Sequence, residues 1–374
     1  MASNKILDEI TAAGVSIWLD DLDRHRIESG DLARLMADDD VRGVTTNPTI
    51  FAKALSGETS AYGPQLAELA SAGASVDEAV RALTTTDVRS ACDVFHDLWV
   101  SSDGVDGRVS IEVDPRLARE AAETILQARL LHGMVDRGNV LIKIPATAEG
   151  LPAITQVLGS GISVNVTLIF SIERYAEVIQ AWMSGLELAA ANGHDLSTIE
   201  SVASFFVSRM DSAVDARLDK MDSDEARALR GQAALASARL AWGVYQDAMA
   251  SPRWQALAAK GAHPQRPLWA STGVKDPAFP DTRYVIDLVV RGCVNTMPEA
   301  TLRAVADHGV FEGDTVSGTQ AASRQIWDRL EELGISESAI CQELEDEGVE
   351  KFEASWNELL DTVRTALAAA RPSA

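Results

Sequence analysis

Eight short segments of β-branched and aromatic residues alternate with longer helical patterns along this chain of 374 residues. Strands that alternate with helices form βα units and a parallel sheet, and eight such units favour closure into a (β/α)8 barrel. An open, doubly wound sheet is the alternative, although no glycine-rich G-x-G-x-x-G turn follows the first strand. The expected strands cover residues 16–20, 43–47, 108–114, 140–146, 162–170, 202–208, 267–272 and 293–297.

The chain carries no fixed-period repeat and no low-complexity linker, so we expect residues 1–374 to form a single barrel domain. Residues 211–262 are more than one barrel helix needs, and they predict an inserted helical pair. From about residue 311 the sequence is acidic and amphipathic, which predicts a C-terminal helical extension that packs on the outside of the barrel.

The net charge of −23 comes from 33 Lys and Arg residues against 56 Asp and Glu residues. A field of this sign disfavours nucleic acid and anionic membranes, although a local basic cluster would still admit an anionic small substrate. No apolar run approaches the ~18 residues of a membrane span, and the N-terminus does not read as a secretory signal. Three scattered cysteines favour neither a disulfide framework nor a zinc site. We therefore expect a cytoplasmic protein with reduced thiols.

A lysine interrupts the apolar strand in "NVLIKIPATAEG", residues 139–150. Lysine is almost never fully buried unless another group pairs with it or uses it. Side chains alternate across a strand, so Val140, Ile142 and Ile144 share one face and Lys143 lies on the other. If the β-branched face meets the helices, Lys143 points into the barrel; the alternative is that its ammonium reaches solvent at the strand end.

The same alternation sorts the polar residues of other strands. It favours Asp20 over Asp21 as the inward carboxylate, and it places Val164, Val166 and Leu168 together on an outer face. Burying many polar groups costs free energy unless they satisfy one another, and barrel active sites form at the carboxyl ends of the strands. For each residue alone a satisfied hydrogen bond is an equally good interpretation, but their convergence favours a site. The inward polar set is Asp20, Asn47, Glu112, Lys143, Asn165, Thr167 and Ser204.

This set supports Schiff-base chemistry. Burial disfavours the ammonium form of a lysine, and a neutral amine can attack a carbonyl to form an iminium that accepts electrons from an adjacent C–C bond. Asp20 is the candidate for proton transfer at that bond, while Glu112 and Thr167 are candidates to hold a water that relays protons. Asn47 and Asn165 suit the binding of sugar hydroxyls. No histidine is well placed for a Ser–His triad, and "LDDLD" lacks a second cluster that would complete a metal site.

Five segments in register resemble the transaldolase family, in its longer bacterial branch: "GVTTNPTIFAKAL", "RVSIEVDPRLA", "VLIKIPATAEGLPAI", "VNVTLIFSIERY" and "SFFVSRMDSAVD". They follow the family order and span roughly residues 15–310. The resemblance implies a (β/α)8 barrel that needs neither metal nor cofactor. It also implies transfer of a dihydroxyacetone unit from sedoheptulose 7-phosphate to glyceraldehyde 3-phosphate in the non-oxidative pentose phosphate pathway.

The resemblance also implies roles for particular residues. Lys143 matches the Schiff-base lysine and Asp20 the acid/base aspartate, while Glu112 and Thr167 match the pair that holds the catalytic water. The residues that match the lining of the substrate pocket are Asn47, Asn165, Ser204 and Phe206.

The phosphate site matches less closely. Arg209 aligns with one phosphate arginine of the family, but after the seventh strand this chain reads "ASTGVKDP" where other members read A-S-F-R. Ser271 is kept, Gly273 takes the place of the arginine, and Lys275 follows two residues later. Lys275 is the candidate to supply the missing charge, and a solvated loop lysine is the alternative.

Two other functions remain open at this point. A fructose-6-phosphate-type aldolase on the same scaffold would release free dihydroxyacetone; such enzymes tend to carry a tyrosine where this chain has Phe206, so the phenylalanine favours transfer. A sugar-phosphate-binding barrel without turnover is the other. We expect phosphorylated sugars as the binding partners, no nucleic-acid or membrane partner, and a monomer or homodimer.

Overall fold

The computed structural model describes residues 4–57, 59–221 and 223–370. Eight parallel strands close into a barrel in sequence order, because the first strand pairs with both the second and the last. This confirms the predicted (β/α)8 barrel with additional helices. The strands are β1 (Ser16–Leu19), β2 (Gly43–Val44), β3 (Arg108–Glu112), β4 (Val140–Pro145), β5 (Val164–Ile169), β6 (Ser201–Phe206), β7 (Arg266–Ala270) and β8 (Val294–Met297).

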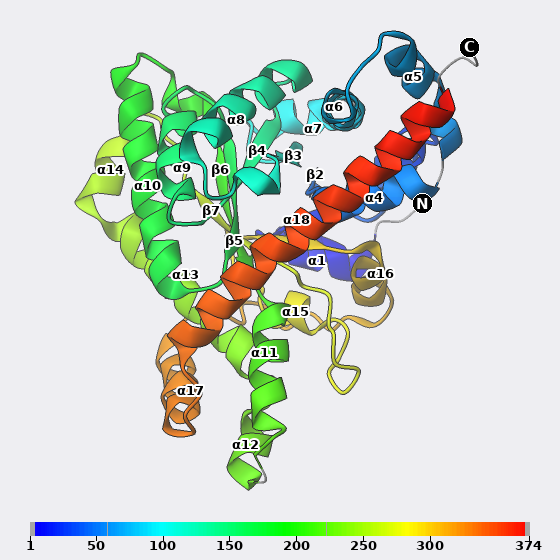
Figure 1. Cartoon of the computed structure of the whole chain (residues 1–374). Helices are drawn as coiled ribbons and strands as arrows, with labels where there is room; N and C mark the ends of the chain where they lie inside the picture. The colour runs from blue at the N-terminus through cyan, green and yellow to red at the C-terminus, as the bar shows by residue number, and fades with distance from the viewer. Residues whose placement is uncertain (1–3, 58, 222, 371–374) are drawn as a thin grey trace.

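Helices follow every strand and surround the barrel (Figure 1). The helices before β5 are α1 (Lys5–Ala12), α2 (Arg24–Glu28), α3 (Asp31–Asp38), α4 (Pro48–Gly57), α5 (Thr59–Ser71), α6 (Val76–Val94), α7 (His96–Ser101), the 3₁₀ turn η1 (Pro115–Leu117), α8 (Ala121–Val135) and α9 (Gly150–Leu158). Those after β5 are α10 (Ile172–Ala191), η2 (Leu196–Thr198), α11 (Ser208–Leu218), α12 (Asp224–Leu229), α13 (Ala233–Ala250), α14 (Pro252–Ala258), α15 (Arg283–Ile286), α16 (Glu299–His308), α17 (Gln320–Glu332) and α18 (Glu337–Ala370).

The connection between β6 and β7 differs from the expected helical pair. It consists of four helices, α11 to α14, and α13 packs against α10 and β7 as part of the layer around the barrel. A buried carboxylate joins the first and third of these helices, because Asp211 accepts a hydrogen bond from the backbone N–H of Ala234 at 2.8 Å. The prediction missed this arrangement because glycine or proline does not mark all of the breaks: Gly231 and Pro252 mark the later two, but the sequence between α11 and α12 contains neither residue.

The amino-terminal end of the barrel is filled. Trp18 of β1 is fully buried, and a Cβ at Gly43 would lie 2.6 Å from its indole, so only glycine fits beside the ring. Below it Arg266 donates to the Ser16 hydroxyl at 2.8 Å and pairs with Asp106 at 3.3 Å. Among the described residues of the barrel, room for a small molecule therefore lies at the carboxyl ends of the strands.

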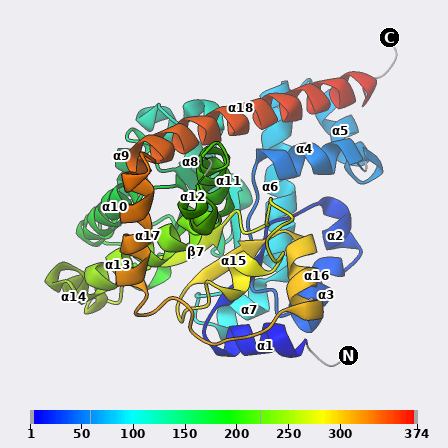
Figure 2. The same ribbon diagram turned by 90° about the horizontal axis from the view of Figure 1, so that it is seen from below.

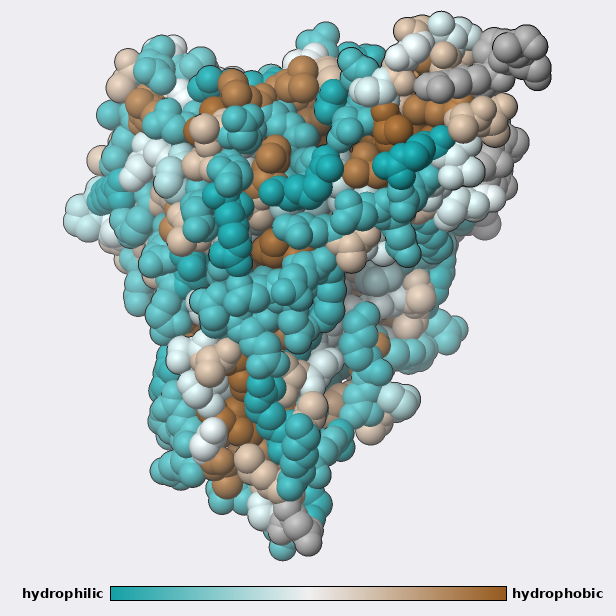
Figure 3. Space-filling view, in the orientation of Figure 1, coloured by the Kyte–Doolittle hydropathy of each residue, from teal (hydrophilic) through white to brown (hydrophobic). Residues whose placement is uncertain are grey.

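The long helix α18 crosses that carboxyl end. It runs from α17 to α5 in both ribbon views and packs on α4, α6, α11 and η1, which follow the strand ends (Figures 1 and 2). Its large apolar residues are buried, whereas Glu343, Glu350 and Lys351 are among its exposed residues. The face of the molecule that α18 crosses is accordingly mostly hydrophilic (Figure 3).

Strand alternation ends early in β5. The register of β5 on β6 shifts between Val166 and Ile169, and Leu168 adopts a left-handed backbone with φ of 59°. Leu168 was expected to face the helix layer beside Val166, but it lies against Gly348 of α18 instead. The bulge therefore corrects the outward assignment of Leu168.

Candidate active site

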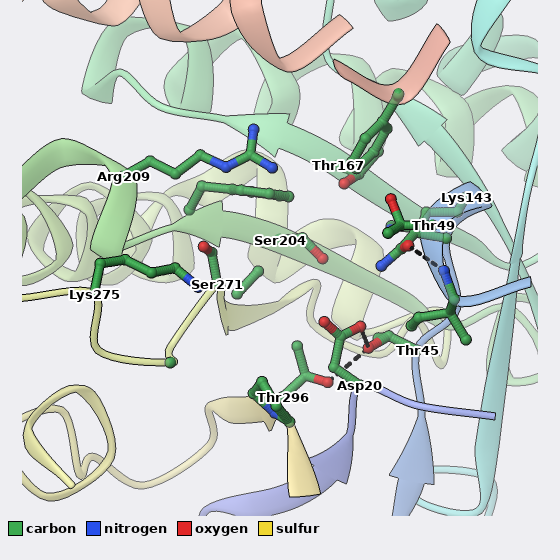
Figure 4. A pocket seen from close by; sticks show the side chains of 17 residues that line it. Asp20, Thr45, Thr49, Lys143, Thr167, Ser204, Arg209, Ser271, Lys275 and Thr296 are labelled. Carbon is green, nitrogen blue, oxygen red and sulfur yellow. Dashed lines mark hydrogen bonds between the residues drawn. The ribbon is translucent and has the colours of Figure 1, made fainter. Parts of the chain in front are cut away.

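A pocket of about 320 Å³ opens at the carboxyl end of the barrel. Figure 4 shows Arg209, Ser271 and Lys275 at one end of it and Asp20 and Thr45 at the other. Glu112 and Asn165 lie outside the lining. The residues predicted from the sequence that line the pocket are Asp20, Asn47, Lys143, Thr167, Ser204, Phe206, Arg209, Ser271 and Lys275.

Lys143 lies inside the barrel and not at a solvated strand end. The strand register pairs it with Glu112 on one side and Asn165 on the other, so all three point inward at one level. The residue is 4% exposed, and Nζ lies 3.3 Å from Glu112 Oε2 and donates to the Thr46 carbonyl oxygen at 3.2 Å. The structure thus excludes the alternative in which the ammonium escapes to water.

Glu112 and Thr167 flank the lysine from neighbouring strands. Burial raises the pKa of Glu112 to about 7, an effect that Lys143 opposes and Asp20 reinforces. The Thr167 hydroxyl and Glu112 Oε1 have no hydrogen-bond partner within the described part of the chain. Near neutral pH Glu112 can therefore either accept or donate a proton, and the Thr167 hydroxyl in the pocket lining is open to a further hydrogen bond.

Asp20 follows the end of β1 and is oriented by two threonines. Thr45 donates to Asp20 Oδ1 at 2.7 Å, and the hydroxyls of Thr45 and Thr296 lie 2.7 Å apart (Figure 4). Burial raises the pKa of Asp20, opposed by Lys143, Thr45 and Lys275. Asp21 faces away and pairs with Arg26 at 3.2 Å. Asp20 is thus the carboxyl group that shares the pocket with Lys143.

The two asparagines occupy different positions. Asn165 is fully buried beneath the pocket, where its amide donates to Ser110 at 3.0 Å and accepts from Ser204 at 2.7 Å. Asn47 lines the pocket and accepts from the backbone N–H of Ile50 at 3.0 Å, at the start of α4. Asn47 is therefore available to a ligand, whereas Asn165 reaches the pocket through the Ser204 hydroxyl that it holds.

Cationic groups gather at the other end of the pocket. The Arg209 guanidinium lies 5.3 Å from the Phe206 ring, and its buried Nη1 has no hydrogen-bond partner among the described residues. Burial lowers the pKa of Arg209, opposed by Glu347. The Ser271 hydroxyl lies 3.0 Å from that of Ser208, and Lys275 completes this part of the lining. Two cations and a hydroxyl suit a phosphate monoester.

Comparison with known proteins places this barrel in a family. A family model described as transaldolase/fructose-6-phosphate aldolase matches residues 17–363. The chain is 60% identical to the transaldolase of Thermobifida fusca (strain YX) over 97% of this chain and 98% of that protein. It is 57% identical to the transaldolase of Mycolicibacterium smegmatis over 99% of this chain and 100% of that protein. The chain belongs to the transaldolase/fructose-6-phosphate aldolase family.

Sequence reasoning missed several residues around the site of this family member, among them two threonines and two aromatic residues. Thr45 and Thr296 could have been predicted, because strand alternation places Thr45 on the same face as Asn47 and because Thr296 is near a strand end. Phe352 of α18 lines the pocket, and Trp356 lines a small adjoining cavity with Glu112. No sequence signal indicated these two, because the position of a surface helix over the barrel depends on packing between distant segments.

The structure describes residues 4–57, 59–221 and 223–370. These residues contain no group of three or more His, Cys, Asp or Glu side chains that could hold a metal ion, and no helix among them is long and apolar enough to cross a membrane. Cys92, Cys293 and Cys341 are all buried free thiols, and burial raises the pKa of each. None of the three lines the pocket.

Proposed function

We propose that this protein catalyses the transaldolase reaction. It transfers a dihydroxyacetone unit from sedoheptulose 7-phosphate to glyceraldehyde 3-phosphate, giving erythrose 4-phosphate and fructose 6-phosphate, in the non-oxidative pentose phosphate pathway. The observation that carries the proposal is Lys143, which is buried 3.3 Å from Glu112 in a pocket that it shares with Asp20 and with the cations at the far end. Similarity along nearly the whole chain to proteins named transaldolase supports the same activity.

The first half of the reaction builds the covalent intermediate. The Lys143 amine adds to the keto carbon of the donor, and the carbinolamine loses water with proton transfers through a water molecule held by Glu112 and Thr167. Asp20 then takes the proton of the donor hydroxyl beside the bond to be broken. The C–C bond breaks, the aldose phosphate leaves as an aldehyde, and the electron pair moves into the iminium to form an enamine.

The second half reverses these steps on the acceptor. The enamine carbon attacks the aldehyde carbon of glyceraldehyde 3-phosphate, and Asp20 returns its proton to the new hydroxyl. Water then adds to the iminium and the C–N bond breaks, which frees the ketose product and the Lys143 amine. Every proton transfer in this scheme uses a side chain of this chain or water.

The remaining lining holds the substrate. We assign the phosphate to Arg209, Ser271 and Lys275, and the sugar chain to Asn47, Ser204 and Phe206, with Asn165 acting on the substrate or through Ser204. Three buried free cysteines are consistent with a cytoplasmic location. A monomer or homodimer stays a prediction.

Reductive trapping tests the proposal. Fructose 6-phosphate and borohydride should together add the mass of a reduced dihydroxyacetone adduct to the peptide that contains Lys143. Lys143→Ala should abolish the adduct and reduce transfer to background. An unmodified wild-type protein, or an adduct that persists in the variant, would overturn the mechanism.

A fructose-6-phosphate-type aldolase is the second candidate, because the family description includes that activity. Phe206 offers a ring without a hydroxyl at 5.2 Å from the Phe170 ring, which favours transfer because no phenol is present there to donate a proton. The two activities differ in one assay: an aldolase releases dihydroxyacetone from fructose 6-phosphate without an acceptor, whereas transfer requires erythrose 4-phosphate.

A further inference from the structure

The helix α18 brings an aromatic side chain to the reactive lysine. Phe352 lies in the middle of this helix, is 5% exposed, and lines the pocket. The centre of its ring is 5.6 Å from Lys143 Nζ. The face of an aromatic ring attracts a cation at this distance without a hydrogen bond. The ring therefore covers the nitrogen that would carry the Schiff base and still tolerates its positive charge.

The neighbouring turns of α18 fix the ring in this position. Gly348 lies one turn before Phe352, and a Cβ there would be 3.1 Å from Leu168 Cδ2, so the missing side chain lets the helix approach the strand ends closely. Trp356 lies one turn after Phe352 and is buried beside Asn47 and Glu112. Residues four apart share a helix face. This face, Gly348–Phe352–Trp356, covers the Lys143–Glu112 pair.

The chemistry beneath this face has a branch point. After the aldose phosphate leaves, the nucleophilic carbon of the enamine, which is next to the carbon bonded to Lys143 Nζ, can attack the acceptor aldehyde, whose oxygen takes a proton from Asp20. Alternatively the carbon takes a proton from solvent; one water then adds to the iminium carbon, the C–N bond breaks, and free dihydroxyacetone and the lysine amine are released. Excluding bulk water from the carbon favours the first outcome.

We propose that Phe352 shields the enamine carbon from solvent protonation and thereby determines that the unit is transferred and not released. The inference rests on the proposed Schiff-base function of Lys143. Phe352 is a specificity-determining residue on this view, supplied by a helix outside the barrel. It acts together with Phe206 of β6, so that rings without hydroxyls meet the pocket from two different elements.

The test compares transfer with release in Phe352→Ala. The enzyme is given fructose 6-phosphate in D₂O without an acceptor, and dihydroxyacetone release is followed together with its deuterium content. Transfer to erythrose 4-phosphate is measured in parallel. We expect acceptor-independent release to rise by about tenfold in the variant and the ratio of transfer to release to fall by about the same factor. The released dihydroxyacetone should carry deuterium from protonation of the enamine carbon. In Phe352→Leu, which keeps an apolar cover, the ratio of transfer to release should stay within about twofold of the wild-type ratio.

Leu359→Ala is the matched control, because Leu359 is fully buried on the same helix and lines neither the pocket nor its adjoining cavity. It should leave the ratio unchanged, and an equal rise in release would overturn the inference by assigning the effect to loosening of α18. If Phe352→Ala does not fold, Phe352→Val removes the ring with a smaller loss of volume. A variant that traps the borohydride adduct but keeps the wild-type ratio overturns the inference alone. A wild-type protein that forms no adduct overturns the proposed function.

Discussion

At the scale of single residues, the pKa values of the carboxyl groups around this pocket depend on their burial and on the charges beside them. Lys143, Glu112 and Asp20 come from three different strand ends, and each carboxyl group has its pKa raised by burial while Lys143 opposes the shift. The two carboxyl groups share this low-dielectric space, and the charge of Asp20 adds to the upward shift in the pKa of Glu112. Because burial raises the pKa of Glu112 to about 7, this carboxyl group can exchange a proton near neutral pH, which is what formation and release of a Schiff base need.

Asp20→Asn should separate Schiff-base formation from C–C cleavage. The amide keeps the hydrogen bond from Thr45 but cannot accept the proton of the donor hydroxyl. We expect the borohydride adduct on Lys143 to form, while kcat for transfer falls by about 10²–10⁴-fold. Transfer at the wild-type rate would exclude Asp20 as the group that moves this proton.

Glu112 should produce an acid limb in the pH profile. Because its pKa is about 7, Glu112 is protonated below that pH and cannot take a proton from the relaying water. We expect kcat/KM to fall as the pH drops below about 7, and this limb to disappear in Glu112→Gln together with about 10²-fold of the activity. If the limb is unchanged in Glu112→Gln, the titrating group is another one, with Asp20 the next candidate.

Arg209 and Lys275 should act on the phosphate group alone. Removing a charged hydrogen-bond donor by Lys275→Ala should raise KM for phosphorylated sugars by about tenfold, and Arg209→Ala should raise it further because its guanidinium is the more buried. Both effects should vanish with unphosphorylated fructose as the donor. Lys220→Ala is a control, since Lys220 lines the adjoining outer groove but not the pocket. Wild-type kinetics in Lys275→Ala would support the solvated-loop interpretation.

At the scale of elements, the turn from β4 to α9 keeps Lys143 in place. The backbone N–H of Ala146 donates to the Thr167 carbonyl oxygen at 2.7 Å, and that of Gly150 donates to the Thr147 hydroxyl at 3.0 Å. A Cβ at Gly150 would overlap the Pro145 carbonyl oxygen, so the chain can turn this tightly only with glycine at that position.

Gly150→Ala should therefore destabilise the protein and weaken the active site. We expect a loss of about 2–3 kcal/mol in the free energy of unfolding, because the turn must open at the end of the lysine strand. Gly133→Ala, in the last turn of α8 with open space around it, should instead stabilise by about 0.5–1 kcal/mol. Denaturant unfolding monitored by circular dichroism measures both, and equal effects would contradict the steric explanation.

At the scale of the whole molecule, we propose that the chain is one domain in which α18 is part of the barrel fold. This helix contacts elements that follow β2, β3 and β6, so it ties together parts of the chain that are distant in sequence. The surface it presents is hydrophilic, in keeping with a net charge of −23, while the cations needed for phosphate lie in the pocket (Figure 3).

Unfolding should accordingly be a single transition. Leu359→Ala should cost about 2–4 kcal/mol and shift the whole calorimetric transition to lower temperature. Near-ultraviolet circular dichroism, which reports on buried tryptophans of the barrel such as Trp18 and on Trp356 of α18, should show the same single midpoint. A separate early transition for α18 would contradict the single-domain proposal.

Much of the fold could be predicted from local patterns. Residue types and their spacing predicted the alternation of strands and helices. All eight expected strands are present, and their ends differ from the expected ones by at most three residues. The inward direction of Lys143 follows from the β-branched residues around it, because side-chain alternation is a local property of a strand. Alternation gave the wrong direction for the Leu168 side chain, because the strand has a bulge there that no residue type predicts.

The sequence by itself therefore determined the barrel, the reactive lysine and the inward polar residues that strand alternation predicts. Only the tertiary structure decided the register that places Glu112 3.3 Å from Lys143, the threonine pair behind Asp20 and the path of α18 that sets Phe352 above the lysine. These features join residues that are up to 251 positions apart. Local propensity carries no information about such contacts, because they depend on which surfaces meet when the whole chain packs.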